Sequence, residues 1–124
     1  LAVDCMDNPK GRYLLNRICL KRKIPFVHGA VEGFSGHVFS IVPGGPCLRC
    51  AFPSLPNHWN GVPVLGAAAG VIGSLQAAEA IKLLTGIGER PNGRALFLDL
   101  ISGQADEVLF ARNPACTECG SLVP

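Results

Sequence analysis

The pattern of hydrophobic and polar positions predicts a strand, a helix and a second strand in the first quarter of the chain. Residues 1–5 are a short apolar run that ends in polar residues, as in a buried strand. Asp7-Asn8-Pro9 then predicts a helix start, with a capping side chain and a proline in the first turn. Apolar residues recur at helical spacing and predict its covered face: Leu14, Leu15, Ile18 and Cys19. A strand over 25–30 completes the crossover unit of a parallel sheet.

The middle of the chain predicts a further strand, a loop and a long helix. Residues 37–42 alternate between apolar and polar, as a strand with one covered face does, and the Pro-Gly-Gly-Pro run after them ends it. Residues 53–63 are rich in proline and predict an irregular loop. A helix rich in glycine and alanine is predicted over 65–84, with Gly86 as its stop. Its glycines would let another backbone approach closely.

The last part of the chain predicts an antiparallel pair of strands. Residues 93–100 and 107–110 are the two strands, and Ser102-Gly103 is the turn that joins them. Together with the parallel unit at the start, this pair makes the predicted sheet a mixed one. The fold class is therefore α/β, with a mixed sheet and flanking helices.

Composition favours one globular unit and excludes several function classes. The 124 residues are 48% hydrophobic and 16% charged, which allows a sizeable core. The net charge of +2 is too small to indicate nucleic-acid binding, and the basic run over 21–23 complements the dipole at a helix end. Polar residues interrupt the helix over 65–84, so we interpret it as a buried helix of a soluble protein, not a membrane span. The first residues show no secretory signal, and we expect the chain to begin within a strand.

Four of the six cysteines form two Cys-x-x-Cys pairs. These are Cys47 with Cys50 and Cys116 with Cys119, and each pair can place two sulfurs on one metal ion. Four thiolates predict a tetrahedral zinc site without an open position, hence a structural role. Disulfides and a redox-active pair are the alternatives. The ample apolar content argues against a secreted disulfide scaffold, and we expect a reducing cytoplasm.

An acidic turn lies at the end of the first predicted strand. Asp4-Cys5-Met6-Asp7-Asn8 occupies the edge where open α/β sheets bind ligands, and its carboxylates could hold magnesium. The alternative is purely structural: Asp7 caps the helix and Asp4 is a solvated charge at a strand end. The turn alone does not separate these interpretations.

The order of these features along the chain carries a family resemblance. The features that carry it are, in chain order, the Asp4-Cys5-Met6-Asp7-Asn8 turn, Arg12, Asn16, Gly29-Ala30, Gly33, Gly36, the first cysteine pair, the run from Gly70 to Lys82 (GVIGSLQAAEAIK) and the second cysteine pair. In this order they resemble the ThiF/MoeB/HesA family, relatives of ubiquitin-activating enzymes. The likeness extends from Leu1 to Gly120, and the combination is highly specific.

The resemblance implies a Rossmann-like ThiF/MoeB-type fold of which residues 1–124 are the carboxyl-terminal part. They would belong to a single adenylation domain whose amino-terminal, glycine-rich, nucleotide-binding half is absent here. It also implies a structural zinc on the four cysteines, magnesium on Asp7 and ATP beside Asp7 and Asn8. The terminal glycine carboxylate of a ubiquitin-like sulfur carrier of the ThiS/MoaD kind would attack the α-phosphate of ATP. We expect this chain alone to be inactive.

The resemblance further implies a homodimer and a role in a pathway such as thiamine or molybdopterin biosynthesis. The chain departs from the sulfur-transferring members of the family at one place. These members usually carry a cysteine in the loop that corresponds to residues 53–64, and this loop contains no cysteine here. Cys5 and Cys19 are expected in the core instead. A thioester or persulfide step is therefore not expected.

Two other interpretations of the chain remain open. One is a non-catalytic, zinc-stapled module that binds a β-grasp partner, and the other is a zinc ribbon that binds nucleic acid. The histidines decide little: His28 and His37 are expected to be structural, and contact of His58 with a bound tail is an alternative for that residue.

Overall fold

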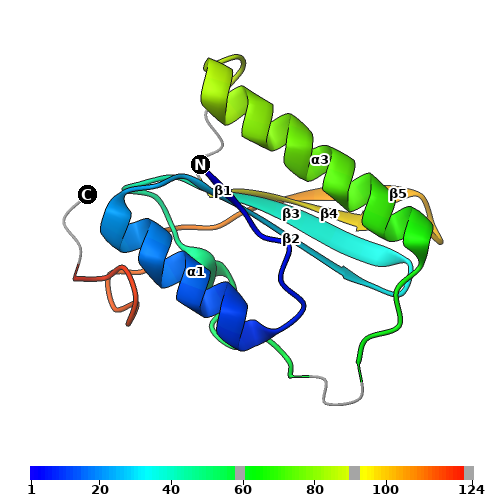
Figure 1. The fold of residues 1–124 in the computed structure, drawn as a ribbon, viewed down its shortest axis with the longest axis horizontal. Helices are drawn as coiled ribbons and strands as arrows, with labels where there is room; N and C mark the ends of the chain where they lie inside the picture. The colour runs from blue at the N-terminus through cyan, green and yellow to red at the C-terminus, as the bar shows by residue number, and fades with distance from the viewer. Residues whose placement is uncertain (58–60, 90–92, 122–124) are drawn as a thin grey trace.

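The computed structural model describes residues 1–57, 61–89 and 93–121 and contains a five-stranded sheet between helices (Figure 1). The elements in chain order are β1 (Ala2–Val3), α1 (Pro9–Arg22), β2 (Phe26–Glu32), β3 (Ser35–Ile41), α2 (Leu48–Ala51), α3 (Gly66–Thr85), β4 (Arg94–Asp99) and β5 (Gln104–Leu109). The strands follow one another across the sheet in sequence order. β1 pairs with β2 in parallel, and all later pairings are antiparallel. The predicted mixed sheet is confirmed.

Alternation along β2 and β3 separates two hydrophobic clusters on opposite faces of the sheet. Phe26 and Phe39 face α1 and α2, where they pack with Cys19 and Leu48. Val27 and its neighbours on the other face pack against α3. Figure 1 shows α1 and α3 on opposite sides of the sheet.

Two strand glycines allow α3 to lie close to the sheet. A Cβ atom at Gly29 would stand 2.3 Å from the Gln76 side chain, and one at Gly36 would stand 2.6 Å from Ile72 Cγ1. Gly36 also approaches backbone, since the same Cβ would lie 2.8 Å from the carbonyl oxygen of Ala30. Glycine is therefore required at Gly36, whereas a side chain at Gly29 would displace the end of the Gln76 side chain.

The predicted covered face of α1 is confirmed for Cys19, which is buried, and for Leu15, which packs against the core, but not for Leu14 and Ile18. Leu14 and Ile18 are 56% and 47% exposed, whereas Asn16 is fully buried and Cys19 nearly so. Periodicity of apolar residues locates a stripe on a helix but does not say what lies against it. Here the side of α1 with Asn16 meets α2, because Asn16 Oδ1 accepts a hydrogen bond from the backbone N–H of Leu48 (3.0 Å).

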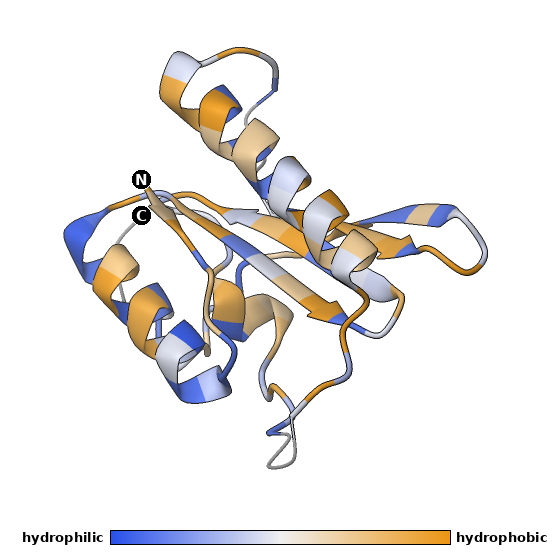
Figure 2. Ribbon diagram, turned by 45° about the vertical axis from the view of Figure 1, so that its right-hand side comes forward, coloured by the Kyte–Doolittle hydropathy of each residue, from blue (hydrophilic) through white to orange (hydrophobic). Residues whose placement is uncertain are grey.

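The long helix α3 is covered on one side only, so the expectation of a buried helix is wrong for this chain. Ala68, Ile72, Gln76 and Ala80 are its buried residues. Apolar residues also run along the rest of the helix (Figure 2). Among the described helices, α3 alone has the length and apolar composition of a membrane span, and 17% of its most apolar window is buried. Since helices that pack on a sheet pass the same test, this is weak evidence for a membrane.

We predict opposite effects on stability for two glycine-to-alanine substitutions. Gly36→Ala should lower the free energy of unfolding by about 1–3 kcal/mol, because the added methyl group meets the fixed carbonyl of Ala30 as well as Ile72. Gly73→Ala is the matched control within α3, where, apart from the adjoining residues and backbone of the helix itself, no described atom lies within 4 Å of the new methyl group. Gly73→Ala should raise stability by roughly 0.5–1 kcal/mol through helix propensity, because Gly73 is an exposed position within α3. Denaturant unfolding of both variants checks this, and equal effects would contradict the packing of α3 described above.

Candidate functional site

A cleft of about 930 Å³ opens on the α1 side of the sheet. The turn before α1 forms one wall with Asp7 and Asn8, and the first turn of α1 adds Arg12. The sheet contributes His37 and Phe97, and residues on either side of 58–60 form the rim. The acidic turn singled out in the sequence therefore borders a cavity large enough for a small-molecule ligand.

Asn8, not Asp7, caps the helix that begins at this turn. Asn8 has extended backbone angles, and its Oδ1 accepts a hydrogen bond from the N–H of Gly11 (2.8 Å). The structural interpretation of Asp7 as the cap is therefore wrong. Asp7 is exposed, and its Oδ1 accepts from Asn8 Nδ2 (3.0 Å). The carboxylate of Asp7 has no capping role and faces the cleft beside the positive end of α1.

Asp4 is buried, which corrects its interpretation as a solvated charge. It is 1% exposed, and its Oδ1 accepts from the N–H of Met6 (2.8 Å). Its Oδ2 lies 2.5 Å from Nδ1 of His28 and 3.7 Å from Nη1 of Arg12. A carboxylate removed from water requires such partners.

His28 and His37 continue this buried polar chain toward the cleft. Their Nε2 atoms lie 3.1 Å apart, and the His37 ring stacks on Phe52 with a centroid separation of 4.8 Å. Burial lowers the pKa of His28 despite the neighbouring Asp4. Burial, with His28 and Arg12 nearby, lowers the pKa of His37 to about 3. Both rings are thus held neutral. They are structural histidines as expected, with partners that the sequence did not reveal. His58 lies outside the described residues.

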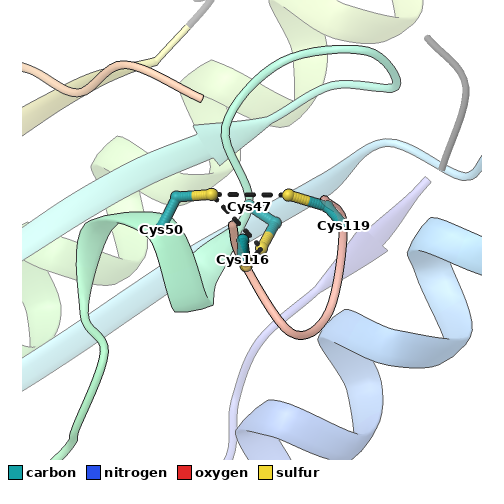
Figure 3. Close-up of side chains that lie close together, drawn as sticks. All are labelled: Cys47, Cys50, Cys116 and Cys119. Atoms are coloured by element: carbon teal, nitrogen blue, oxygen red, sulfur yellow. Dashed lines mark hydrogen bonds between the residues drawn. The ribbon is translucent and has the colours of Figure 1, made fainter. Parts of the chain in front are cut away.

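The four paired cysteines meet at one point (Figure 3). Their sulfur atoms all lie within 4.8 Å of one another. The separations are 3.9 Å between Cys47 and Cys50, 3.7 Å between Cys47 and Cys116, and 3.4 Å between Cys50 and Cys119. All four thiols are free, and the group could hold one metal ion.

Backbone around the cysteines is shaped for sulfur ligation. The short helix α2, which the sequence did not predict, carries Cys50 one turn after Cys47. The N–H of Asn113 donates to Cys50 Sγ (3.5 Å). A Cβ at Gly120 would lie 2.3 Å from the carbonyl oxygen of Pro114, so the second pair sits in a turn that requires glycine. Such tight turns direct both sulfurs inward.

An ion pair joins the second cysteine pair to α1. Arg17 donates two hydrogen bonds to Glu118, at 3.0 and 2.9 Å, while the Glu118 side chain is only 6% exposed. The bond from Arg17 lowers the pKa of Glu118. The same helix thus contacts the cysteine cluster along its middle and the cleft at its amino end.

The electrostatics of the thiols differ from one cysteine to the next. Burial raises the pKa of Cys47 strongly and that of Cys119 to about 11. Burial would also raise the pKa of Cys116, but backbone N–H groups of Cys119 and Glu118 bring it to about 7. Of the two remaining cysteines, Cys19 is buried as expected, whereas Cys5 is exposed because β1 ends before it.

We predict that acid destabilises the protein through its buried histidines. The pKa of His37 is about 3 in the folded state against an ordinary 6.5, so the unfolded chain binds more protons between these values. Stability should therefore fall as the pH drops below about 6.5, by at most about 1.4 kcal/mol per pH unit for each such histidine. His28 acts in the same direction.

Denaturant unfolding at pH 7.5, 6.0 and 5.0 measures this slope. His37→Gln should flatten it, whatever the substitution does to stability at pH 7.5. An unchanged slope would mean that His37 is not held neutral.

Comparison with known proteins places these features in one family. The model of the ThiF family matches residues 1–118. The SAMP-activating enzyme E1 of Haloferax volcanii is 44% identical and aligns with 97% of this chain and 46% of its own length. The molybdopterin-synthase adenylyltransferase of Escherichia coli is 39% identical and aligns with 97% of this chain and 50% of its own length. Protein HesA of a Nostoc species is 37% identical and aligns with 100% of this chain and 50% of its own length.

Solved structures agree with the fold. Escherichia coli MccB superposes with a TM-score of 0.80 at 17% identity, over 95% of this chain and 38% of that one. The structure of MccB with ATP gives a TM-score of 0.79 at 19% identity, over 95% of this chain and 39% of that one. The chain therefore spans half or less of the length of these relatives. From the extent of the family match and the identity to these relatives, we conclude that the chain belongs to the ThiF family.

Proposed function

We propose that the chain is part of an ATP-dependent adenylyltransferase that activates the terminal glycine carboxylate of a ubiquitin-like sulfur carrier. The observation that carries the proposal is the cleft itself, in which Asp7 and Asn8 line the wall beside the start of α1. Two relatives that align with 97% of the chain are named as an activating enzyme and as an adenylyltransferase. The carrier would be of the ThiS/MoaD kind, in a pathway such as molybdopterin or thiamine biosynthesis.

In the proposed reaction the carrier carboxylate forms a bond to the α-phosphorus of ATP, and the bond from that phosphorus to the bridging oxygen breaks. A carboxyl-adenylate and pyrophosphate result. Asp7 is the ligand proposed for a magnesium ion, which would offset charge on the phosphates. Asn8 holds the helix start in place with its cap and lines the cleft, where it is the residue proposed to border the nucleotide. Alignment and charge compensation are the main requirements, because the carboxylate needs no general base.

We propose zinc as the metal of the cysteine cluster. Zinc–sulfur bonds of about 2.3 Å in a tetrahedron place sulfurs about 3.8 Å apart. The separations of 3.9, 3.7 and 3.4 Å in the cluster are close to this spacing. With four protein sulfurs the ion would have no open position, so it would join the segment before α2 to the turn near the end of the chain.

The remaining parts of the proposal concern the complete protein. We propose that an amino-terminal half supplies the glycine-rich loop and basic residues for the phosphates, because this chain spans about half of its relatives. We also propose a homodimer, as the resemblance implies. The free thiols agree with a reducing cytoplasm.

We predict about one zinc ion per chain, measured by elemental analysis of the purified protein. Cys116→Ser should remove most of it, and a chelator should lower the unfolding temperature markedly, since structural zinc contributes on the order of 10 kcal/mol in small peptides. Cys5→Ser is the matched control, because Cys5 is exposed and lies outside the cluster. Disulfides in place of a metal would overturn the assignment.

We predict that Asp7→Asn lowers carrier-dependent exchange of pyrophosphate into ATP by roughly 100-fold in the complete protein. The substitution removes the charge proposed to bind magnesium and leaves the cap intact, because Asn8 supplies it. The unfolding temperature should stay within about 2 °C of the parent.

Glu107→Gln removes a carboxylate from β5 outside the cleft lining and serves as the control for loss of one negative charge. Exchange at the parental rate in Asp7→Asn would show that Asp7 takes no part in the reaction. Absence of exchange in the unsubstituted protein, with the carrier bound, would favour the non-catalytic binding module.

A further inference from the structure

Buried polar groups of Asp4 and of α3 hold the turn that carries Asp7 in place. Its first residue, Asp4, accepts the N–H of Met6 through Oδ1 at 2.8 Å. From α3, Gln76 Nε2 donates to the carbonyl oxygen of Asp4 at 2.9 Å. The turn is therefore tied to the sheet and to α3 before α1 begins.

Arg12 closes the turn from the other side. Its Nη2 donates to the carbonyl oxygen of Met6 (2.7 Å), and its Nη1 donates to the carbonyl oxygen of Gly29 at the middle of β2 (3.0 Å). The side chain is 14% exposed and also lines the cleft. The planar guanidinium thus bridges two backbone segments at once, which a single ammonium group cannot do in the same geometry.

The two shortest contacts assign the proton positions in the chain Asp4–His28–His37, and the longer approach of Arg12 Nη1 to His28 Nδ1 (3.5 Å) is then not a hydrogen bond. Arg12 beside Asp4 favours the carboxylate, so the contact of 2.5 Å between Asp4 Oδ2 and His28 Nδ1 requires the proton on Nδ1. Nε2 of the neutral His28 is then an acceptor. The contact of 3.1 Å with Nε2 of His37 requires the proton on the His37 side. His37 therefore carries its proton on Nε2 and leaves Nδ1 unprotonated.

We propose that Asp4, His28 and Arg12 act as a positioning unit that sets the Asp7 carboxylate for the adenylation reaction. Asp4 fixes the guanidinium by charge, His28 fixes the Asp4 carboxylate, and Arg12 fixes the Met6 carbonyl one residue before Asp7. All three act through the turn, so none of them needs to contact the substrate. The catalytic meaning of the unit rests on the proposed function, whereas its hydrogen-bond pattern does not.

Nitrogen NMR of selectively labelled histidine in the complete protein tests the pattern directly. We expect His28 in the Nδ1-protonated form and His37 in the Nε2-protonated form at pH 7.5. The opposite tautomer at His28, or a charged ring, would overturn the unit as described.

Hydrogen exchange at the Met6 amide tests whether Arg12 holds the turn. Arg12→Lys should speed this exchange by roughly tenfold or more, since it removes a charge-assisted hydrogen bond to the Met6 carbonyl. Arg22→Lys is the matched control, an exposed arginine in the last turn of the same helix. Equal protection in the parent and Arg12→Lys would show that the turn does not depend on Arg12.

Pyrophosphate exchange then tests the catalytic role. Arg12→Lys should raise the magnesium concentration for half-maximal exchange by roughly tenfold, while KM for the carrier changes less than about twofold. When Arg12→Lys is combined with Asp7→Asn, the exchange rate should fall by less than about twofold beyond that of Asp7→Asn alone, because both substitutions act on the Asp7 carboxylate. Additive losses or a raised carrier KM would overturn the positioning role. If the unsubstituted protein shows no exchange, the proposed function fails, while the tautomers and Met6 exchange still decide on the unit.

Discussion

The register between β2 and β3 decides which side chains meet on each face of the sheet. His28 lies opposite Phe39 and Ala30 opposite His37, so the two histidines are diagonal neighbours on the face toward α1. A slip of one residue would turn them toward α3 and bring valines to the cleft side. The cleft, the buried polar chain and the packing of α3 all depend on this one pairing.

α1 connects the cleft with the cysteine cluster. Its amino end carries the turn with Asp7, and its middle meets α2 and the second cysteine pair through Asn16 and Arg17. Figure 1 shows the segment near the carboxyl end beside this helix. A metal at the cysteines would thus stabilise the helix that borders the cleft without taking part in the chemistry there. This separation of roles agrees with a closed ligand set.

The polar chain below the turn explains why this sheet edge contains buried charge at all. Asp4 and Arg12 lose water contacts, which is costly unless every group finds a partner. Here the carboxylate is bonded by backbone and imidazole, and the guanidinium by two carbonyl oxygens. An apolar core at this place would be simpler to build, but it could not hold a polar turn at the edge of a cleft. The arrangement stabilises one geometry of the turn rather than the fold as a whole.

The sequence by itself determined the elements other than the short helix α2, and it determined the motif residues, since these rest on local periodicity, turn residues and ligand spacing. The mixed sheet, the helix start before Pro9 and the four cysteines that come together were all predictable in this way. Tertiary structure alone decided which surfaces are covered. Periodicity marked Leu14 as core, yet it is exposed, and Asp4 is buried although its type favours water. The partners of Asp4 come from residues 12 and 28, and such distant contacts are set by strand register and helix packing, which no local pattern encodes.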